Sequence, residues 1–143
     1  MFRALTFGEI LWDIIEGEPY IGGAPFNLAA HLTRMGGEVS MVSALGDDDL
    51  GRRAREKALS FGINTEFVSE STDSPTGTVD VFLDADGHPD YTIHEGTAWD
   101  RLAIPEPLLG KLILREWDVI CFGILAQRSS VNRSLLSDIL SQA

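Results

Sequence analysis

Four residues between positions 22 and 27 have types and spacing that could hold a ligand. Gly22 and Gly23 carry no Cβ, so the backbone there can turn tightly and leave room for a ligand to approach. Pro25 suits the first turn of a helix, and Asn27 then offers an amide that donates and accepts near the helix start. The pattern is typical of a turn that holds a small polar ligand, and equally of a loop-to-helix junction that holds none.

Phosphate, cofactor and metal motifs are weak elsewhere in the chain. Residues 22–27 contain no lysine, serine or threonine, so this turn is not a P-loop, and no G-x-G-x-x-G follows a predicted strand. Asp47, Asp48 and Asp49 open a predicted helix, where carboxylates cap the first N–H groups and interact with the helix dipole. A metal ion there would need further oxygen ligands from elsewhere, so we predict no metal site.

The composition is that of a single globular domain. The chain has 143 residues, 44% of them hydrophobic, and no apolar run is long enough to span a bilayer. Acidic residues outnumber basic ones 22 to 11, and the net charge of −11 argues against binding to nucleic acid or an anionic membrane. We expect a cytoplasmic protein that binds a small molecule. The single Cys121 excludes a disulfide, and its apolar neighbours predict an inert buried thiol.

Strand and helix signals alternate along the chain, which indicates βαβ units around a parallel sheet. Apolar runs predict strands at 4–8, 39–45 and 119–122, the last one buried, with a short edge strand at 67–68. Amphipathic spacing predicts helices at 24–35, 47–61 and 130–140. The positions expected to face the sheet are Leu50, Ala54, Ala58 and Phe61 in the second helix, and Val131, Leu135, Leu136, Ile139 and Leu140 in the last.

Two segments break this alternation. Residues 14–21 are short and mixed in character. Within 76–95, apolar and polar side chains alternate from Thr78 to Leu83, and Asp86-Gly87 marks a turn, which predicts a β-hairpin. Strands inserted into an α/β unit in this way can form a separate small sheet that covers a site.

Taken together, these residues resemble the ribokinase/fructokinase (PfkB-type) family of carbohydrate kinases. Its signature is a Gly-Gly turn, an asparagine, a small residue and two later glycines, with a Gly-Glu-x-Leu-x-Asp motif after the first strand. The matching positions are Gly22, Gly23, Asn27, Ala29, Gly36 and Gly46, with Gly8, Glu9, Leu11 and Asp13 for the motif. The resemblance implies a ribokinase-like three-layer α/β/α fold with a parallel Rossmann-like sheet, incomplete here, and a small β lid.

The reaction implied by the resemblance is transfer of the ATP γ-phosphoryl group to a sugar hydroxyl. Asp13, at the carboxyl end of the first strand, would accept hydrogen bonds from two neighbouring hydroxyls; without the resemblance it would be a solvated loop carboxylate. Asn27 would bind another hydroxyl, while Gly22 and Gly23 let the sugar ring come close. The family also implies a lid, here 14–21 and 76–95, that closes over the sugar and excludes water.

The lid implied by the resemblance brings further candidate contacts and a candidate partner. Phe82, Tyr91 and Ile93 would form its apolar underside. The complete set of possible lid or pocket contacts is Phe82, Tyr91, Ile93, His94, Gly123 and Gln127. Lids of neighbouring subunits pair in several relatives, so a homodimer is expected.

The identity of the sugar stays open between two kinases. Gly8-Glu9 and Pro25 resemble the fructokinase branch, which favours fructose. The competitor is a 2-keto-3-deoxygluconate kinase, whose relatives place an arginine on the lid where this chain has His94, so a neutral ketose fits better.

The second half of the family signature, Gly-x-Gly-Asp, does not occur in these residues. Its aspartate is the base for the sugar hydroxyl and its glycine-rich helix start holds the phosphates. The resemblance implies ATP and Mg²⁺, with the ATP site expected outside this chain. We therefore expect residues 1–143 to be the N-terminal, sugar-binding part of a kinase and to be inactive alone. The alternative from another class is a non-catalytic sugar-binding or interaction module.

Overall fold

The main sheet consists of four parallel strands in the order β5-β4-β1-β8. The computed structural model describes residues 1–142. The strands span Arg3–Phe7 (β1), Glu38–Gly46 (β4), Val68–Ser71 (β5) and Val119–Phe122 (β8). β1 and β4 are buried along nearly their whole length, because they lie inside the sheet with helices on both faces.

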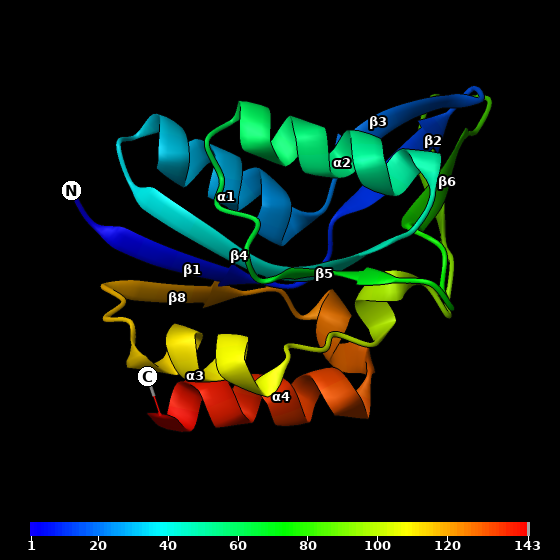
Figure 1. Ribbon diagram of the computed structural model, residues 1–143. Helices are drawn as coiled ribbons and strands as arrows, with labels where there is room; N and C mark the ends of the chain where they lie inside the picture. Colours follow the sequence, from blue (N-terminus) through cyan, green and yellow to red (C-terminus); the bar gives the residue numbers. More distant parts are fainter. Residues whose placement is uncertain (143) are drawn as a thin grey trace.

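Two helical layers cover this sheet, with α1 and α2 on one face and α3 and α4 on the other (Figure 1). The helices span Ala24–Arg34 (α1), Asp49–Ser60 (α2), Glu106–Leu114 (α3) and Ser130–Gln142 (α4), with 3-10 turns at Ala98–Asp100 (η1) and Leu125–Arg128 (η2). Neighbouring residues of β4 belong to two hydrophobic cores on opposite faces of the sheet. Met41 is in the core that contains Phe26 and Ala54, and Val42 is in the core that contains Leu112 and Leu136. The expected three-layer α/β/α arrangement is confirmed.

A second, small sheet projects from one end of the main sheet (Figure 1). Its order is β3-β2-β6-β7, and its strands span Leu11–Ile15 (β2), Glu18–Gly22 (β3), Gly77–Leu83 (β6) and Pro89–Ile93 (β7). The predicted hairpin is β6–β7, and its Asp86-Gly87 turn is confirmed by the φ of +80° at Gly87. The mixed segment 14–21 is the end of β2 and most of β3, paired antiparallel. Both irregular segments therefore belong to one sheet.

The prediction that β8 is buried is wrong. Val119 and Phe122 are 39% and 50% exposed, and Cys121 is half-buried, so its thiol is not enclosed either. The reason lies in the topology: within residues 1–142, β8 pairs with β1 on one side only, so it forms an edge of the sheet. An apolar run cannot distinguish a central strand from an edge strand.

The helices differ from expectation in two places. Leu136 and Ile139 of α4 are buried as predicted, but Val131 and Leu140 are largely exposed, because the part of the sheet below α4 ends at β8. α3 lies outside the predicted elements; it begins with Pro107 in its first turn, and Gly110, a poor helix former, interrupts its apolar residues. Among residues 1–142 there is no helix with both the length and the apolar character needed to cross a membrane.

Candidate functional site

The carboxyl ends of β1 and β8 meet the start of α1 and the base of the small sheet, which is where open α/β sheets place their ligands (Figure 1). Close backbone packing at this junction requires glycine. Gly23 has a φ of +106°, and a Cβ on it would lie 2.5 Å from the Glu9 carbonyl oxygen. Gly8 has a φ of +144°, and a Cβ there would lie 2.6 Å from Cγ of Pro25. The Gly-Gly turn is thus pressed against the chain that leaves β1.

Asp13 and Gly22 are brought together by the pairing of β2 with β3. Gly22 lies opposite Leu11, two residues before Asp13 on the same face of the sheet. A Cβ on Gly22 would lie 2.6 Å from Oδ2 of Asp13, so any larger residue at position 22 would displace this carboxylate from where it lies. Asp13 is half-buried, and this burial raises its pKa above the ordinary value. The result is a partly buried carboxylate that lies over the backbone of Gly22 and can accept hydrogen bonds from hydroxyl groups.

Asn27 lies one turn into α1, where its backbone N–H donates to the Gly23 carbonyl at 2.9 Å. Its residue is exposed, and it borders a hollow of about 230 Å³ together with Phe26 of α1 and Phe61 at the end of α2. The structure therefore brings Asp13 next to Gly22, and Asn27 follows the Gly22–Gly23 turn on α1 and is open to solvent.

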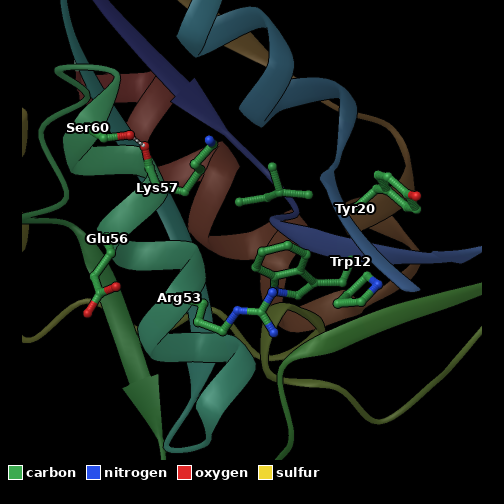
Figure 2. A pocket seen from close by; sticks show the side chains of 8 residues that line it. Trp12, Tyr20, Arg53, Glu56, Lys57 and Ser60 are labelled. Atoms are coloured by element: carbon green, nitrogen blue, oxygen red, sulfur yellow. Dashed lines mark hydrogen bonds between the residues drawn. The ribbon is translucent and has the colours of Figure 1, made fainter. Parts of the chain in front are cut away.

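A larger groove, of about 640 Å³, lies on the other face of β2. Figure 2 shows Trp12 of the small sheet facing Arg53 and Lys57 of α2, whereas the Tyr20 ring turns away from them. The Arg53 guanidinium lies 5.0 Å from the Trp12 ring centre, and Nε1 of Trp12 donates to the Leu50 carbonyl at 3.0 Å. Since Trp12 and Asp13 are neighbours on a strand, they point to opposite faces. This groove joins the small sheet to α2 and is separate from the Asp13 face.

Asp48 fixes the first strand of the hairpin to the main body. Its carboxylate accepts hydrogen bonds from the N–H and hydroxyl of Thr76 at 2.8 and 2.7 Å, and caps α2 through the Gly51 N–H at 2.7 Å. Burial alone would raise the pKa of Asp48, but these hydrogen bonds and the nearby Arg52 hold it below the ordinary value. The predicted capping role is confirmed for Asp48. Its bond to Thr76 has no local signal, because the two residues are 28 positions apart.

Arg128 of η2 fixes the other end of the hairpin. Its guanidinium donates to the His94 carbonyl at 2.7 Å and to both carboxylate oxygens of Asp100 at 2.7 and 2.9 Å, and it lies 4.3 Å from the Trp99 ring centre. The hydrogen bond with Asp100 is the main cause of its raised pKa. Sequence reasoning missed Arg128, since nothing near it in the chain indicates a contact with the hairpin.

The register of the small sheet separates the candidate lid residues. Val79 lies opposite both Asp13 and Ile93, and Tyr91 is two residues from Ile93, so these side chains share one face. Phe82 lies on the opposite face, so the expectation that Phe82, Tyr91 and Ile93 form a common underside is wrong for Phe82. The strand register explains the error. Phe82 is two residues from Asp80 along β6, so the two side chains lie on the same face of the sheet. Asp80 pairs with Ile14, on the face opposite Asp13.

His94 belongs to that opposite face as well. His94 is exposed, and its Nε2 lies 2.8 Å from Oδ2 of the half-buried Asp80. The structure therefore does not bring His94 to the face that carries Asp13.

Gly123 and Gln127 lie below the turn, after β8. The Gly123 N–H donates to the Phe7 carbonyl at 3.0 Å, and a Cβ on Gly123 would lie 2.8 Å from Cγ of Pro25. Nε2 of Gln127 donates to the Gly123 carbonyl at 2.9 Å. Gly123 thus packs directly under the start of α1, and Gln127 holds it there.

Comparison with known proteins identifies the family to which this chain belongs. A profile described as "pfkB family carbohydrate kinase" matches residues 5–131, which is most of the chain. The chain belongs to the pfkB family of carbohydrate kinases. A fructokinase of Vibrio alginolyticus is 30% identical over 135 residues, covering 91% of this chain and 44% of that protein. A probable fructokinase of Arabidopsis thaliana is 26% identical over 134 residues, covering 85% and 41%.

Solved structures share the fold. The apo fructokinase of Vibrio cholerae superposes with a TM-score of 0.84 at 22% identity, covering 99% of this chain and 50% of that one. A sugar kinase of Pyrococcus horikoshii, solved with ATP, gives 0.84 at 22% identity, covering 96% and 48%. This pfkB chain therefore has the ribokinase-like fold of sugar kinases, and it spans about half or less of the length of the relatives it matches.

Proposed function

We propose that residues 1–143 are the sugar-binding part and lid of an ATP-dependent kinase whose acceptor is a ketose, with fructose favoured. The observation that carries this proposal is the Asp13 carboxylate held over Gly22, at the end of the sheet where ligands bind. Fructokinases among the matching relatives support the choice of sugar.

Each residue of the turn has a distinct part in binding. Asp13 accepts hydrogen bonds from two neighbouring hydroxyls of the sugar, a geometry that suits a carboxylate with two oxygens. The exposed amide of Asn27 binds a further hydroxyl, and Gly22 and Gly23 let the ring approach the backbone. These residues hold and orient the acceptor, which is a large part of catalysis in phosphoryl transfer.

The small sheet acts as the lid over this site. Its hairpin is fixed at Thr76 by Asp48 and at His94 by Arg128, while the strands between these points project away from the body. Val79, Tyr91 and Ile93 lie on the Asp13 face, where they would exclude water from the acceptor. We place the lid at 14–21 and 76–95. A homodimer is also part of this proposal, and the exposed lid surface is one of its two candidate contacts.

Two features favour a neutral ketose over 2-keto-3-deoxygluconate. His94 is held by Asp80 on the face opposite Asp13, so it offers no cation to a substrate carboxylate. The first turn of α1 carries no basic residue, and the nearby Glu9 is acidic. A third carboxyl group beside those of Asp13 and Glu9 would be unfavourable, because like charges repel at close range.

The residues present do not fit ATP or Mg²⁺. The Gly22–Gly23 turn lacks the lysine and hydroxyl of a phosphate loop, and the buried acidic side chain of Glu9 packs against Gly23 at the start of α1, where a phosphate would have to bind. Asp48 is already occupied by Thr76 and Gly51, and Asp49 pairs with Arg52. We therefore place the nucleotide and metal sites outside this chain and expect no phosphoryl transfer by these residues alone.

The first test is sugar binding by calorimetry. We expect the 143-residue chain to bind fructose more tightly than ribose or 2-keto-3-deoxygluconate. Asp13→Asn should weaken fructose binding at least about tenfold, because a hydrogen bond to a charged acceptor is lost. Asp90→Asn, a matched change on the opposite face of the small sheet, should leave it unchanged. Equal losses in both variants would contradict the site.

The second test is catalysis. The chain mixed with ATP, Mg²⁺ and fructose should form no fructose phosphate. If product forms and Asp13→Asn abolishes it, the chain is active by itself and the proposed inactivity is wrong. Product that is insensitive to Asp13→Asn comes from a contaminating kinase.

A further inference from the structure

The groove on the face of β2 opposite Asp13 has no part in the function proposed above. Its volume of about 640 Å³ is in the range of sites that hold small molecules. Its two walls come from different parts of the fold, one from β2 and β3 of the small sheet and the other from the second half of α2. The chemistry of these walls indicates what the groove can hold.

The wall formed by the small sheet is apolar. Trp12 is only 6% exposed, and its Nε1 donates to a carbonyl of α2 at 3.0 Å, so the orientation of its ring is fixed. Ile21 lies opposite Trp12 in the β2–β3 pairing, and Pro19 is two residues from Ile21, so all three share one face. Tyr20 lies opposite Asp13 on the other face, in agreement with the ring that turns away in Figure 2.

The wall formed by α2 is cationic. Arg53 and Lys57 are four residues apart, so they lie on the same side of the helix, and Figure 2 shows both on the side of Trp12. The Arg53 guanidinium lies 5.0 Å from the Trp12 ring centre, and this contact holds the planar group in place. Glu56 also borders the groove, but its carboxylate points away from Trp12. The inner part of the groove therefore carries two positive charges.

These two charges are only weakly neutralised by the chain itself. Arg53 pairs with Asp49 at 3.9 Å, but the same carboxylate lies closer, at 2.9 Å, to Arg52. Nζ of Lys57 lies 5.2 Å from the Phe61 ring centre and forms no ion pair within residues 1–142. In a chain with a net charge of −11, two such cations side by side are complementary to a small anion.

We propose that this groove binds a small phosphate monoester. Its phosphoryl oxygens accept hydrogen bonds from the Arg53 guanidinium and the Lys57 ammonium group, and its organic part lies against Pro19 and Ile21. A phosphate monoester is favoured over a carboxylate because its charge of about −1.5 to −2 at neutral pH balances two cations. The planar guanidinium can also donate two parallel hydrogen bonds to it.

This site is separate from the proposed sugar site. Trp12 and Asp13 point to opposite faces of β2, so a phosphoryl group held beside Trp12 cannot reach a hydroxyl that Asp13 binds. The ligand is therefore an effector and not the phosphoryl donor. Because it contacts the small sheet and α2 at once, its binding holds the base of the small sheet against the body of the molecule.

The test measures binding of phenyl phosphate by calorimetry at low salt. Arg53→Gln and Lys57→Gln should each weaken binding at least about tenfold, because a charged hydrogen-bond donor is lost. Both residues are exposed, so the variants should fold. Lys111→Gln removes the same charge from α3, on the other face of the main sheet, and should change nothing.

Benzoate, which carries a single charge, should bind more weakly than phenyl phosphate. No binding of phenyl phosphate by the parent chain, or equal losses in Lys57→Gln and Lys111→Gln, would overturn the proposal.

NMR spectra of the same titration locate the probe. Phenyl phosphate should shift the indole N–H resonance of Trp12 and leave those of Trp99 and Trp117 in place. Asp13→Asn should bind the probe as the parent chain does, whether or not the parent binds fructose, so this site and the sugar site are tested independently. Shifts confined to the amides at the start of α1 would place the anion there and contradict the groove.

Discussion

Glycine is required in this chain where two segments of backbone pack closely against each other, as at Gly23. At Gly23 a positive φ and a contact with the Glu9 carbonyl coincide, and at Gly22 the empty side-chain position receives the Asp13 carboxylate. Gly36, at the other end of α1, also has a positive φ, +88°, but no atom lies within 4 Å of its Cβ position. A substitution at Gly36 therefore tests the backbone strain of a positive φ alone, whereas a substitution at Gly23 adds a steric clash to that strain.

Gly23→Ala should destabilise the chain more than Gly36→Ala does. Both substitutions force an alanine into the left-handed region, at about 1–2 kcal/mol each. Only Gly23→Ala also drives a methyl group into the Glu9 backbone, which should bring its total to more than about 3 kcal/mol. Urea denaturation measures both free energies of unfolding. Equal costs would mean that the turn can move away from Glu9.

Among the elements, the hairpin β6–β7 depends on contacts with distant parts of the chain. Asp48 at the start of α2 holds one end and Arg128 in η2 holds the other, so the small sheet is fixed at its base and free at its tip. Because a single carboxylate both caps α2 and binds Thr76, a change at Asp48 should affect the helix and the hairpin together.

Asp48→Asn should lower the free energy of unfolding by about 2 kcal/mol at neutral pH, because the charged acceptor for Gly51 and Thr76 is lost. Asp47→Asn, at the exposed neighbour, should cost little. The pKa of Asp48 is depressed in the folded chain, so its contribution is present above the unfolded pKa and disappears as pH falls through the folded pKa.

The difference between the parent chain and Asp48→Asn should therefore shrink in acid. Denaturation curves collected from neutral pH down to about pH 3 measure it, a range set by the ordinary pKa of aspartate. A difference that stays constant over this range would show that the carboxylate charge plays no part in the anchor.

At the scale of the whole molecule, the β8 edge of the main sheet combines a strand that is unpaired on one side with exposed apolar side chains. Within residues 1–142, β8 has a strand neighbour on one side only, and beside it Phe122 is 50% and Ile124 86% exposed. Unpaired strand edges with apolar side chains promote association. The small sheet offers a second exposed apolar surface, through Phe82 and Tyr91, and a homodimer through that sheet is the competing arrangement.

The chain should self-associate in a concentration-dependent way through the β8 edge. Phe122→Lys should reduce the average mass seen by sedimentation equilibrium, because a charge at the edge opposes pairing. Phe82→Lys, a matched change on the small sheet, should leave the mass unchanged. The reverse result would place the contact on the small sheet and support pairing of lids.

Much of the fold and the core of the site could be predicted from sequence because their signals are local. Alternating strand and helix periods indicated the α/β layers, the Asp86-Gly87 pair indicated the hairpin turn, and Gly22, Gly23 and Pro25 indicated the turn that opens α1. Glycine and proline restrict the backbone where they stand, and periodicity depends on neighbours a few residues away.

Only the tertiary structure decided how distant segments meet. The bond from Thr76 to Asp48, the contact of Arg128 with the hairpin, and the exposed edge at β8 all join or separate residues far apart in the chain. The face taken by Phe82 depends on strand register, and the burial of Glu9 depends on two glycines more than ten residues away. Long-range pairing and packing determine such features, and no local pattern of residue types encodes them.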